Sequence, residues 1–214
     1  MFWHLILALP LTPFFFHRGP EIRFAVLGLY KIDQAGKEDG TEVIEIHEQY
    51  PNPLFNWDTA VYDQMLILLA RPASNNWPVV KMNFNPTIPS QQQNNGGNNN
   101  SNKITVIGNG VIDRNTHFPT VLQKLTVDYL PNEQCKALPG MWQVDSDMVC
   151  VIGDGTTDDQ SQCSGDSGGP YLLLGDSYKT DLLIATVSWY VLNMDNFCVV
   201  FVRIVAAHYW SILL

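Results

Sequence analysis

Positive charge is scarce in this chain. Its 214 residues include 12 Lys and Arg against 21 Asp and Glu, which gives a formal net charge of -9 at pH 7. Nucleic acids and anionic membrane surfaces repel a protein of that charge, so neither is an expected partner. A long apolar helix is also missing, because the apolar run at residues 2–16 is short and broken by prolines. We therefore expect no membrane span.

The apolar run leaves two interpretations open. It has the length of a signal-peptide core, although no Lys or Arg precedes it and no small-x-small cleavage site follows it. The alternative is a buried strand remnant of the folded domain. We assign residues 1–19 to this leader or strand.

Cysteine is sparse, with only Cys135, Cys150, Cys163 and Cys198. No C-x-x-C pair or histidine cluster accompanies them, so we expect neither a metal site nor a cofactor. In an oxidising compartment four cysteines form two disulfides, and the residues alone allow three pairings.

No long helical period is present before the C-terminal tail. Apolar and polar residues instead alternate over residues 22–29, 43–47, 103–107 and 122–127, between turns rich in Gly, Pro and Asn. This pattern predicts short strands and an all-β fold. Residues 89–102, mostly Gln, Asn, Gly and Ser, cannot bury apolar surface and are expected to form a loop between units 20–88 and 103–214.

The hexapeptide GDSGGP at residues 165–170 carries the chemical signal. Its glycines allow backbone turns closed to other residues and leave the Ser167 hydroxyl accessible. Ser167 is therefore the candidate nucleophile. The same turn can direct the N–H groups of Gly165 and Ser167 into one oxyanion hole.

Motifs along most of the chain from Ile22 onward resemble those of the trypsin-like serine peptidase family. Besides residues 163–170, they are Ile46-His47 before a Tyr-Pro turn, Asp63 before MLILLARPA, residues 106–110, 119–124 and 132–135, Ser188-Trp189, and the closing Val200, Phe201, Arg203 and Tyr209-Trp210.

The resemblance implies two packed six-stranded antiparallel Greek-key barrels with the active site in the cleft between them. The first, residues 20–88, is expected to be incomplete; the second, residues 103–214, includes a short C-terminal helix. The family also implies a secreted monomeric endopeptidase that cuts polypeptides through an acyl-enzyme on the serine. It further implies the disulfides Cys135–Cys150 and Cys163–Cys198.

Two aspartates compete for the role of orienting the catalytic base. Asp63 precedes the apolar run 65–69, as in the family, whereas Asp58 is followed by a polar interruption and fits the spacing from His47 better. We choose Asp63, which would accept a hydrogen bond from the imidazole and stabilise the imidazolium. A strand-entry aspartate that caps a turn is the structural alternative.

The general base is the weakest part of the match. None of the five histidines has the family's Ala-Ala-His-Cys setting. His47 is expected at the surface, His117 in a loop, His208 in the terminal helix and His4 in the apolar run. His17 is left as the candidate, with an ordinary loop histidine as the alternative.

The family's activation tetrapeptide, similar to Ile-Val-Gly-Gly, is also missing. In the family its amino group pairs with the aspartate before the serine, here Asp166, and organises the oxyanion hole. We therefore expect low peptidase activity from the chain as given. The alternative function is a catalytically inactive homologue that binds peptides or proteins.

The substrate pocket is implied by the family positions of Ser161, Ser188, Trp189 and Tyr190. Ser161 occupies the family position at the base of the pocket, where an aspartate would bind the Lys or Arg side chain of a substrate. Tyr190 would narrow the pocket mouth. We expect cleavage after small or medium apolar side chains.

Overall fold

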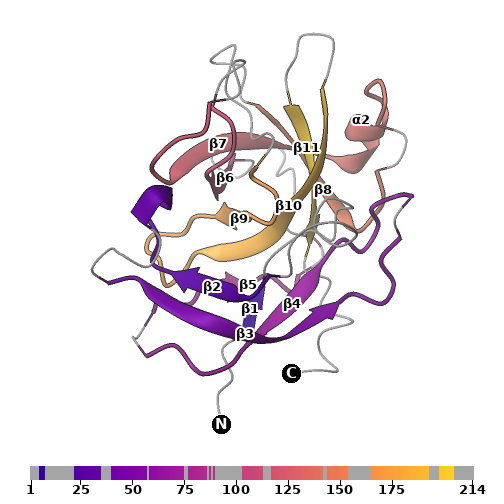
Figure 1. Cartoon of the computed structure of the whole chain (residues 1–214). Coiled ribbons are helices and arrows are strands. Elements are labelled where there is room, and N and C mark those ends of the chain that lie inside the picture. The colour runs from indigo at the N-terminus through magenta and orange to yellow at the C-terminus, as the bar shows by residue number, and fades with distance from the viewer. Residues whose placement is uncertain are drawn as a thin grey trace.

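A computed structural model describes residues 5–7, 22–34, 40–56, 58–74, 77–85, 87, 89, 103–112, 117–141, 144–153, 165–192 and 198–204. These residues form two antiparallel β lobes with little helix (Figure 1). The predicted all-β, double-barrel class is confirmed. No helix in the described ranges has the length and apolar character needed to span a membrane.

The second lobe is a closed six-stranded barrel. Its strands run in the order β11-β8-β7-β6-β9-β10, and pairing of β10 with β11 closes the ring. The strands are β6 (Lys103–Gly108), β7 (Gln123–Leu130), β8 (Met148–Gly153), β9 (Pro170–Leu173), β10 (Leu182–Leu192) and β11 (Cys198–Ile204).

The interior of this barrel is filled by apolar side chains, because alternate residues of each strand face inward. Tyr171 is the largest, and its side chain is fully buried. Burying each such side chain stabilises the fold by about 1.5–3 kcal/mol. The core comprises Ile104, Val106, Val127, Val149, Val151, Tyr171, Ile184, Ala185 and Val187.

The first lobe contains a four-stranded sheet in the order β1-β4-β3-β2. Its core is Ile44, Met65, Ile67 and Leu69. The strands are β1 (Leu5–Leu7), β2 (Phe24–Leu27), β3 (Glu42–Pro51) and β4 (Met65–Leu69), and a 3-10 turn, η1 (Ile32–Gln34), follows β2.

The order β1-β4-β3-β2 matches the order β8-β11-β10-β9 of the second barrel. Only the counterparts of β6 and β7 are missing from the described first lobe, which accounts for the expected incomplete barrel. Pairing of Leu5–Leu7 with β4 corresponds to the strand interpretation of the N-terminal run. The leader interpretation stays a prediction.

Some local expectations differ from the structure. Strand β3 continues through the expected Tyr-Pro turn to Pro51, because Tyr50 and Pro51 pair with Leu66 and Met65 of β4. A short helix, α2 (Asn132–Lys136), was not predicted; it spans a single turn and lacks the repeated apolar period of a longer helix. The expected terminal helix, and the 89–102 loop beyond residue 89, lie outside the described residues.

Backbone pairing joins the two lobes at two places. Strand β5 (Lys81–Met82) runs parallel to β10 of the second barrel. Near η1, the carbonyl of Tyr30 accepts a 2.8 Å hydrogen bond from Leu122 N–H, and Ile32 N–H donates to the carbonyl of Thr120 at 3.1 Å. These contacts fix the relative position of the lobes, so that a site can be built from both.

Glu42 anchors the segment that leads from β4 toward β5. Its carboxylate accepts hydrogen bonds from the Arg71 guanidinium, from the Ser74 N–H at 2.9 Å and hydroxyl at 2.8 Å, and from Trp77 Nε1–H at 3.1 Å. The Arg71 bond, followed by the Ser74 backbone bond, lowers the pKa of Glu42 from 4.5 to about 2. The carboxylate is therefore ionised over the neutral range.

Candidate active site

The GDSGGP turn leads directly into β9. Gly165 and Gly168 have φ angles of 97° and 81°, in the left-handed region that glycine occupies without steric cost. Ser167 lies between them and is partly exposed. The predicted glycine turns are present and leave the serine side chain partly accessible to solvent.

The turn is bound to β10 by two backbone hydrogen bonds. Gly168 N–H donates to the carbonyl of Val187 at 2.8 Å, and Val187 N–H donates to the carbonyl of Gly169 at 2.9 Å. A Cβ atom on Gly169 would lie 2.7 Å from the carbonyl oxygen of Ile107, which explains glycine there. The nucleophile candidate is thus fixed beside the residue that precedes Ser188.

The Asp166 carboxylate lies in a cradle formed by the Gly108-Asn109-Gly110 segment. Gly110 N–H donates to Asp166 Oδ1 at 2.7 Å, and a Cβ atom on either glycine would overlap the carboxylate. Burial, and then the charge of Asp166, raise the pKa of the Tyr171 hydroxyl well above its usual value. The cradle therefore holds Asp166 at the edge of the barrel core.

Asp63 is nearly inaccessible, at 1% exposure, and accepts a hydrogen bond from the Ser188 hydroxyl. Ser188 is 6% exposed, so the bond joins the two lobes in a buried environment. Asp58 instead lies exposed in a turn, where its N–H donates to the Asn56 side chain. The structure thus brings Asp63, and not Asp58, to the strand that holds the serine turn.

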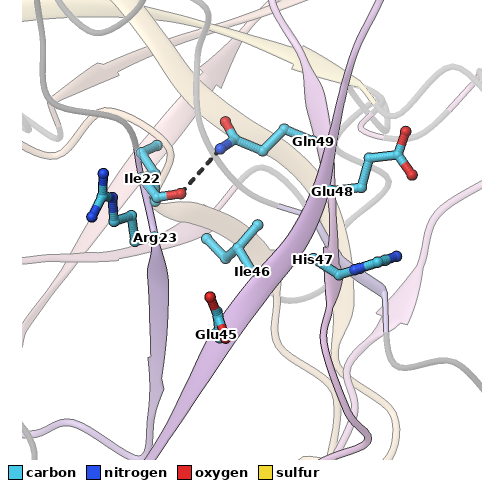
Figure 2. A pocket seen from close by; sticks show the side chains of 7 residues that line it. All are labelled: Ile22, Arg23, Glu45, Ile46, His47, Glu48 and Gln49. Carbon is cyan, nitrogen blue, oxygen red and sulfur yellow. Dashed lines mark hydrogen bonds between the residues drawn. The ribbon is translucent and has the colours of Figure 1, made fainter.

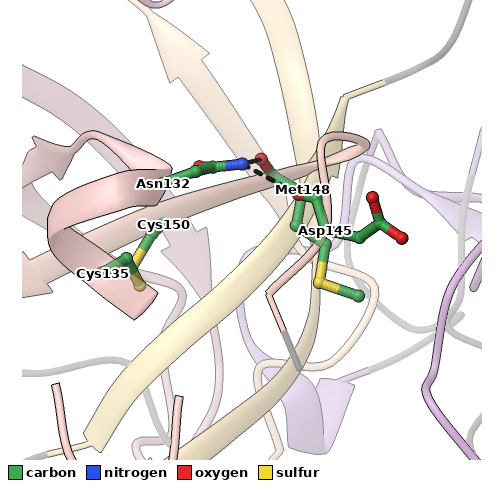
Figure 3. Close-up of a disulfide and its surroundings, with 5 residues drawn as sticks. All are labelled: Asn132, Cys135, Asp145, Met148 and Cys150. Carbon is green, nitrogen blue, oxygen red and sulfur yellow. Dashed lines mark hydrogen bonds between the residues drawn. A yellow bond between two sulfur atoms is a disulfide. The ribbon is translucent and has the colours of Figure 1, made fainter. Parts of the chain in front are cut away.

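A disulfide links Cys135 of α2 to Cys150 of β8, as the resemblance implied (Figure 3). A buried cluster surrounds it, and Trp189 packs against that cluster together with Val61 of the first lobe. The pairing of Cys163 with Cys198 lies outside the described side chains and stays a prediction.

Other expected site residues are also beyond the described part of the chain. His17 and Ser161 are not among the described residues, and Tyr190 is described only in its backbone, within β10. His47 and His117 are exposed. The general base and the pocket floor therefore stay predictions.

A surface hollow of about 450 Å³ lies beside β3, away from these elements (Figure 2). Its lining includes Ile22, Arg23 and His47, and Gln49 Nε2–H donates to the carbonyl of Ile22 at 3.0 Å. Figure 2 shows His47 pointing away from Ile22. Neither Ser167 nor Asp63 lines this hollow, so it is separate from the candidate active site.

The model of the family described as Trypsin matches residues 23–211, which include the second lobe, strands β2 to β4 of the first lobe, Asp63 and the serine turn. This chain belongs to the trypsin family. It is 32% identical over 165 residues to "Serine protease 1" of Canis lupus familiaris, covering 76% of this chain and 58% of the relative. It is also 31% identical over 166 residues to "Cationic trypsin-3" of Rattus norvegicus, covering 76% and 58%.

A third relative is named as a subunit of a clotting factor. "Clotting factor G beta subunit" of Tachypleus tridentatus is 28% identical over 199 residues, covering 87% of this chain and 59% of the relative. The matched part therefore spans less than two thirds of the length of these relatives. The domain is a trypsin-like serine protease domain by family.

Sequence reasoning missed two groups around the site. Gly108 and Gly110 were noted as part of a motif, and their spacing could have indicated a close approach by another group. Asp147, whose carboxylate accepts a hydrogen bond from Tyr62 N–H beside Asp63, lies 85 residues away with no pattern to mark it.

Proposed function

We propose that this trypsin-family domain is a serine endopeptidase with Ser167 as nucleophile and Asp63 as the residue that orients the base. The buried Asp63–Ser188 hydrogen bond carries the proposal, because it unites the aspartate of one lobe with the strand that binds the serine turn. Preorganised groups from two rigid lobes are what acyl transfer requires. His17 stays our candidate for the base.

In the proposed reaction, Ser167 Oγ attacks the peptide carbonyl carbon while its proton passes to the imidazole. The N–H groups of Gly165 and Ser167 stabilise the oxyanion. The imidazolium then protonates the leaving amine as the carbon–nitrogen bond breaks. Water, deprotonated by the imidazole, then attacks the acyl carbon. The bond from that carbon to Ser167 Oγ breaks, the imidazolium returns the proton to Oγ, and the acid is released.

Substrates of the proposed peptidase are polypeptides with a small or medium apolar side chain before the scissile bond. By its family position Ser161 would lie at the pocket base, where it would supply no negative charge for Lys or Arg, and the Tyr190 phenol would narrow the pocket mouth. The Cys135–Cys150 disulfide supports a secreted protein, because such bonds persist in oxidising compartments.

Labelling with a fluorophosphonate tests this function. We expect slow, stoichiometric labelling of the disulfide-intact chain that is lost in Ser167→Ala and strongly reduced in Asp63→Asn and His17→Ala. His47→Ala is the matched control, since this exposed histidine lies on β3, and it should label like the unmodified chain. Absence of labelling in a folded sample would contradict the peptidase and support the inactive, peptide-binding homologue.

A further inference from the structure

The backbone before Asp63 has an unfavourable conformation. Tyr62 has a φ angle of 63° and Ala60 one of 51°, both in the left-handed region. A bulky side chain rarely adopts this region, and each such residue costs on the order of 1–3 kcal/mol unless its surroundings hold it there. The segment therefore depends on contacts outside itself.

Within the first lobe, Asn56 N–H donates to the carbonyl of Val61 at 3.0 Å. Two further contacts come from the second lobe. Asp147 Oδ2 accepts a hydrogen bond from Tyr62 N–H at 3.3 Å. Val61, which lies between Ala60 and Tyr62, packs against the cluster around the Cys135–Cys150 disulfide. One polar and one apolar contact thus hold the segment from the same side.

Asp147 lies in a turn whose neighbouring residues are joined by hydrogen bonds, and Figure 3 draws those made by Asn132. Met148 N–H donates to the carbonyl of Asp145 at 3.0 Å, which closes the turn that contains Asp147. The Asn132 amide donates to the carbonyls of Asp145 and Met148 at 2.8 and 2.9 Å. The disulfide at Cys150 fixes the strand that follows.

The position of Tyr62 determines where the Asp63 side chain points. Gln64 N–H donates to the carbonyl of Tyr62 at 2.8 Å, so Asp63 lies at the apex of a tight turn. A change of φ at Tyr62 therefore reorients the carboxylate that accepts the Ser188 hydrogen bond.

We infer that Asp147 is a positioning residue for the catalytic aspartate: it holds the strained Tyr62 backbone and so aligns Asp63 from the other lobe. This inference rests on the proposed role of Asp63. It assigns to Asp147 a function that acts on Asp63 through the Tyr62 backbone.

Two readouts test the inference. Asp147→Ala should lower the fluorophosphonate labelling rate of Ser167 between about tenfold and a hundredfold, the range expected for small misplacements of a reacting group. It should also speed amide hydrogen exchange in residues 60–64. Asp147→Asn keeps a carbonyl oxygen that can accept the Tyr62 N–H, and should recover most of both properties.

The matched control is Asp145→Ala in the same turn, because this aspartate is exposed and its carboxylate accepts hydrogen bonds from the neighbouring Ser146. It should leave labelling and exchange unchanged. Tyr62→Asn in the Asp147→Ala background should restore labelling, because asparagine tolerates positive φ better than tyrosine. A general loss of folding would not be rescued by that substitution.

The outcomes separate the two proposals. Unchanged exchange in residues 60–64 of Asp147→Ala overturns the positioning role, whether or not the chain reacts. Faster exchange with unaltered labelling also overturns it. If the unmodified chain does not label at all, the proposed function fails, and the exchange result alone decides whether Asp147 holds the segment.

Discussion

The hydrogen bond from Ser188 to Asp63 provides a quantitative test of how the lobes are joined. Both side chains are nearly inaccessible, so solvent does not screen the bond. A hydrogen bond to a charged group contributes about 1.5–3 kcal/mol, and Ser188→Ala should lower the free energy of unfolding by about 2 kcal/mol. For a chain of this length, that loss corresponds to a fall in Tm of about 4–8 °C.

Urea and thermal unfolding of a mutant cycle measure the effect. In an Asp63→Asn background the same substitution removes only a neutral hydrogen bond, and should cost about 1 kcal/mol. Ser146→Ala is the control, because Ser146 makes an exposed 3.1 Å hydrogen bond to the Asp145 carboxylate and should cost under about 0.5 kcal/mol. A Ser188→Ala loss no larger than this control would refute the reasoning.

Three further predictions concern other parts of the molecule. Glu42→Gln should reduce the loss of stability between pH 4.5 and about 2, which thermal unfolding across that range measures. The folded-state pKa of Glu42 is depressed, so its ionised carboxylate stabilises the fold above pH 4.5 and this contribution is lost as the pH falls toward 2. Gly110→Ala should displace the Asp166 carboxylate and abolish fluorophosphonate labelling while the circular dichroism spectrum stays β-like. Replacing Cys135 and Cys150 by serine should lower the urea unfolding free energy by about 3 kcal/mol, for a loop closed over 15 residues.

Surface positions supply controls for two of these. Glu133→Gln, at an exposed carboxylate paired with Lys136 at 3.8 Å, should leave the acid unfolding profile unchanged; an equal effect would contradict the role given to Glu42. Gly40→Ala adds a Cβ atom that meets nothing within 4 Å, so labelling should persist despite some backbone strain at its φ of 89°. Persistent labelling in Gly110→Ala would refute the cradle argument.

The strands of the fold were largely predictable from local pattern. Alternation over residues 103–107 and 122–127 marks β6 and β7, because one face of each strand must enter the barrel core. The preference for Asp63 over Asp58 followed from the apolar run after Asp63. That run is β4, and its burial places the residues before it at the junction of the lobes.

The supports of the site were not predictable, because they depend on contacts between distant residues. The hydrogen bond from Tyr62 N–H to Asp147 joins the two lobes, so it forms only when both are folded. No local sequence pattern predicts a positive φ angle at a tyrosine such as Tyr62. The four donors on Glu42 come from residues 29 to 35 positions later in the chain. The periodicity of the sequence indicates which face of a strand is buried. It does not indicate which distant side chain will contact that face.

The parallel pairing of β5 with β10 has a consequence for the order of folding during synthesis. Lys81 pairs with Leu182, so about a hundred further residues must be synthesised after β5 before its partner strand β10 is present. Contacts so distant in sequence slow folding, because loop-closure entropy is lost before they form. A nascent chain that ends before residue 165 lacks Ser188 and β10, so the Asp63–Ser188 hydrogen bond and the β5–β10 pairing cannot form in it. Both contacts between the lobes therefore form late, after β10 has been synthesised.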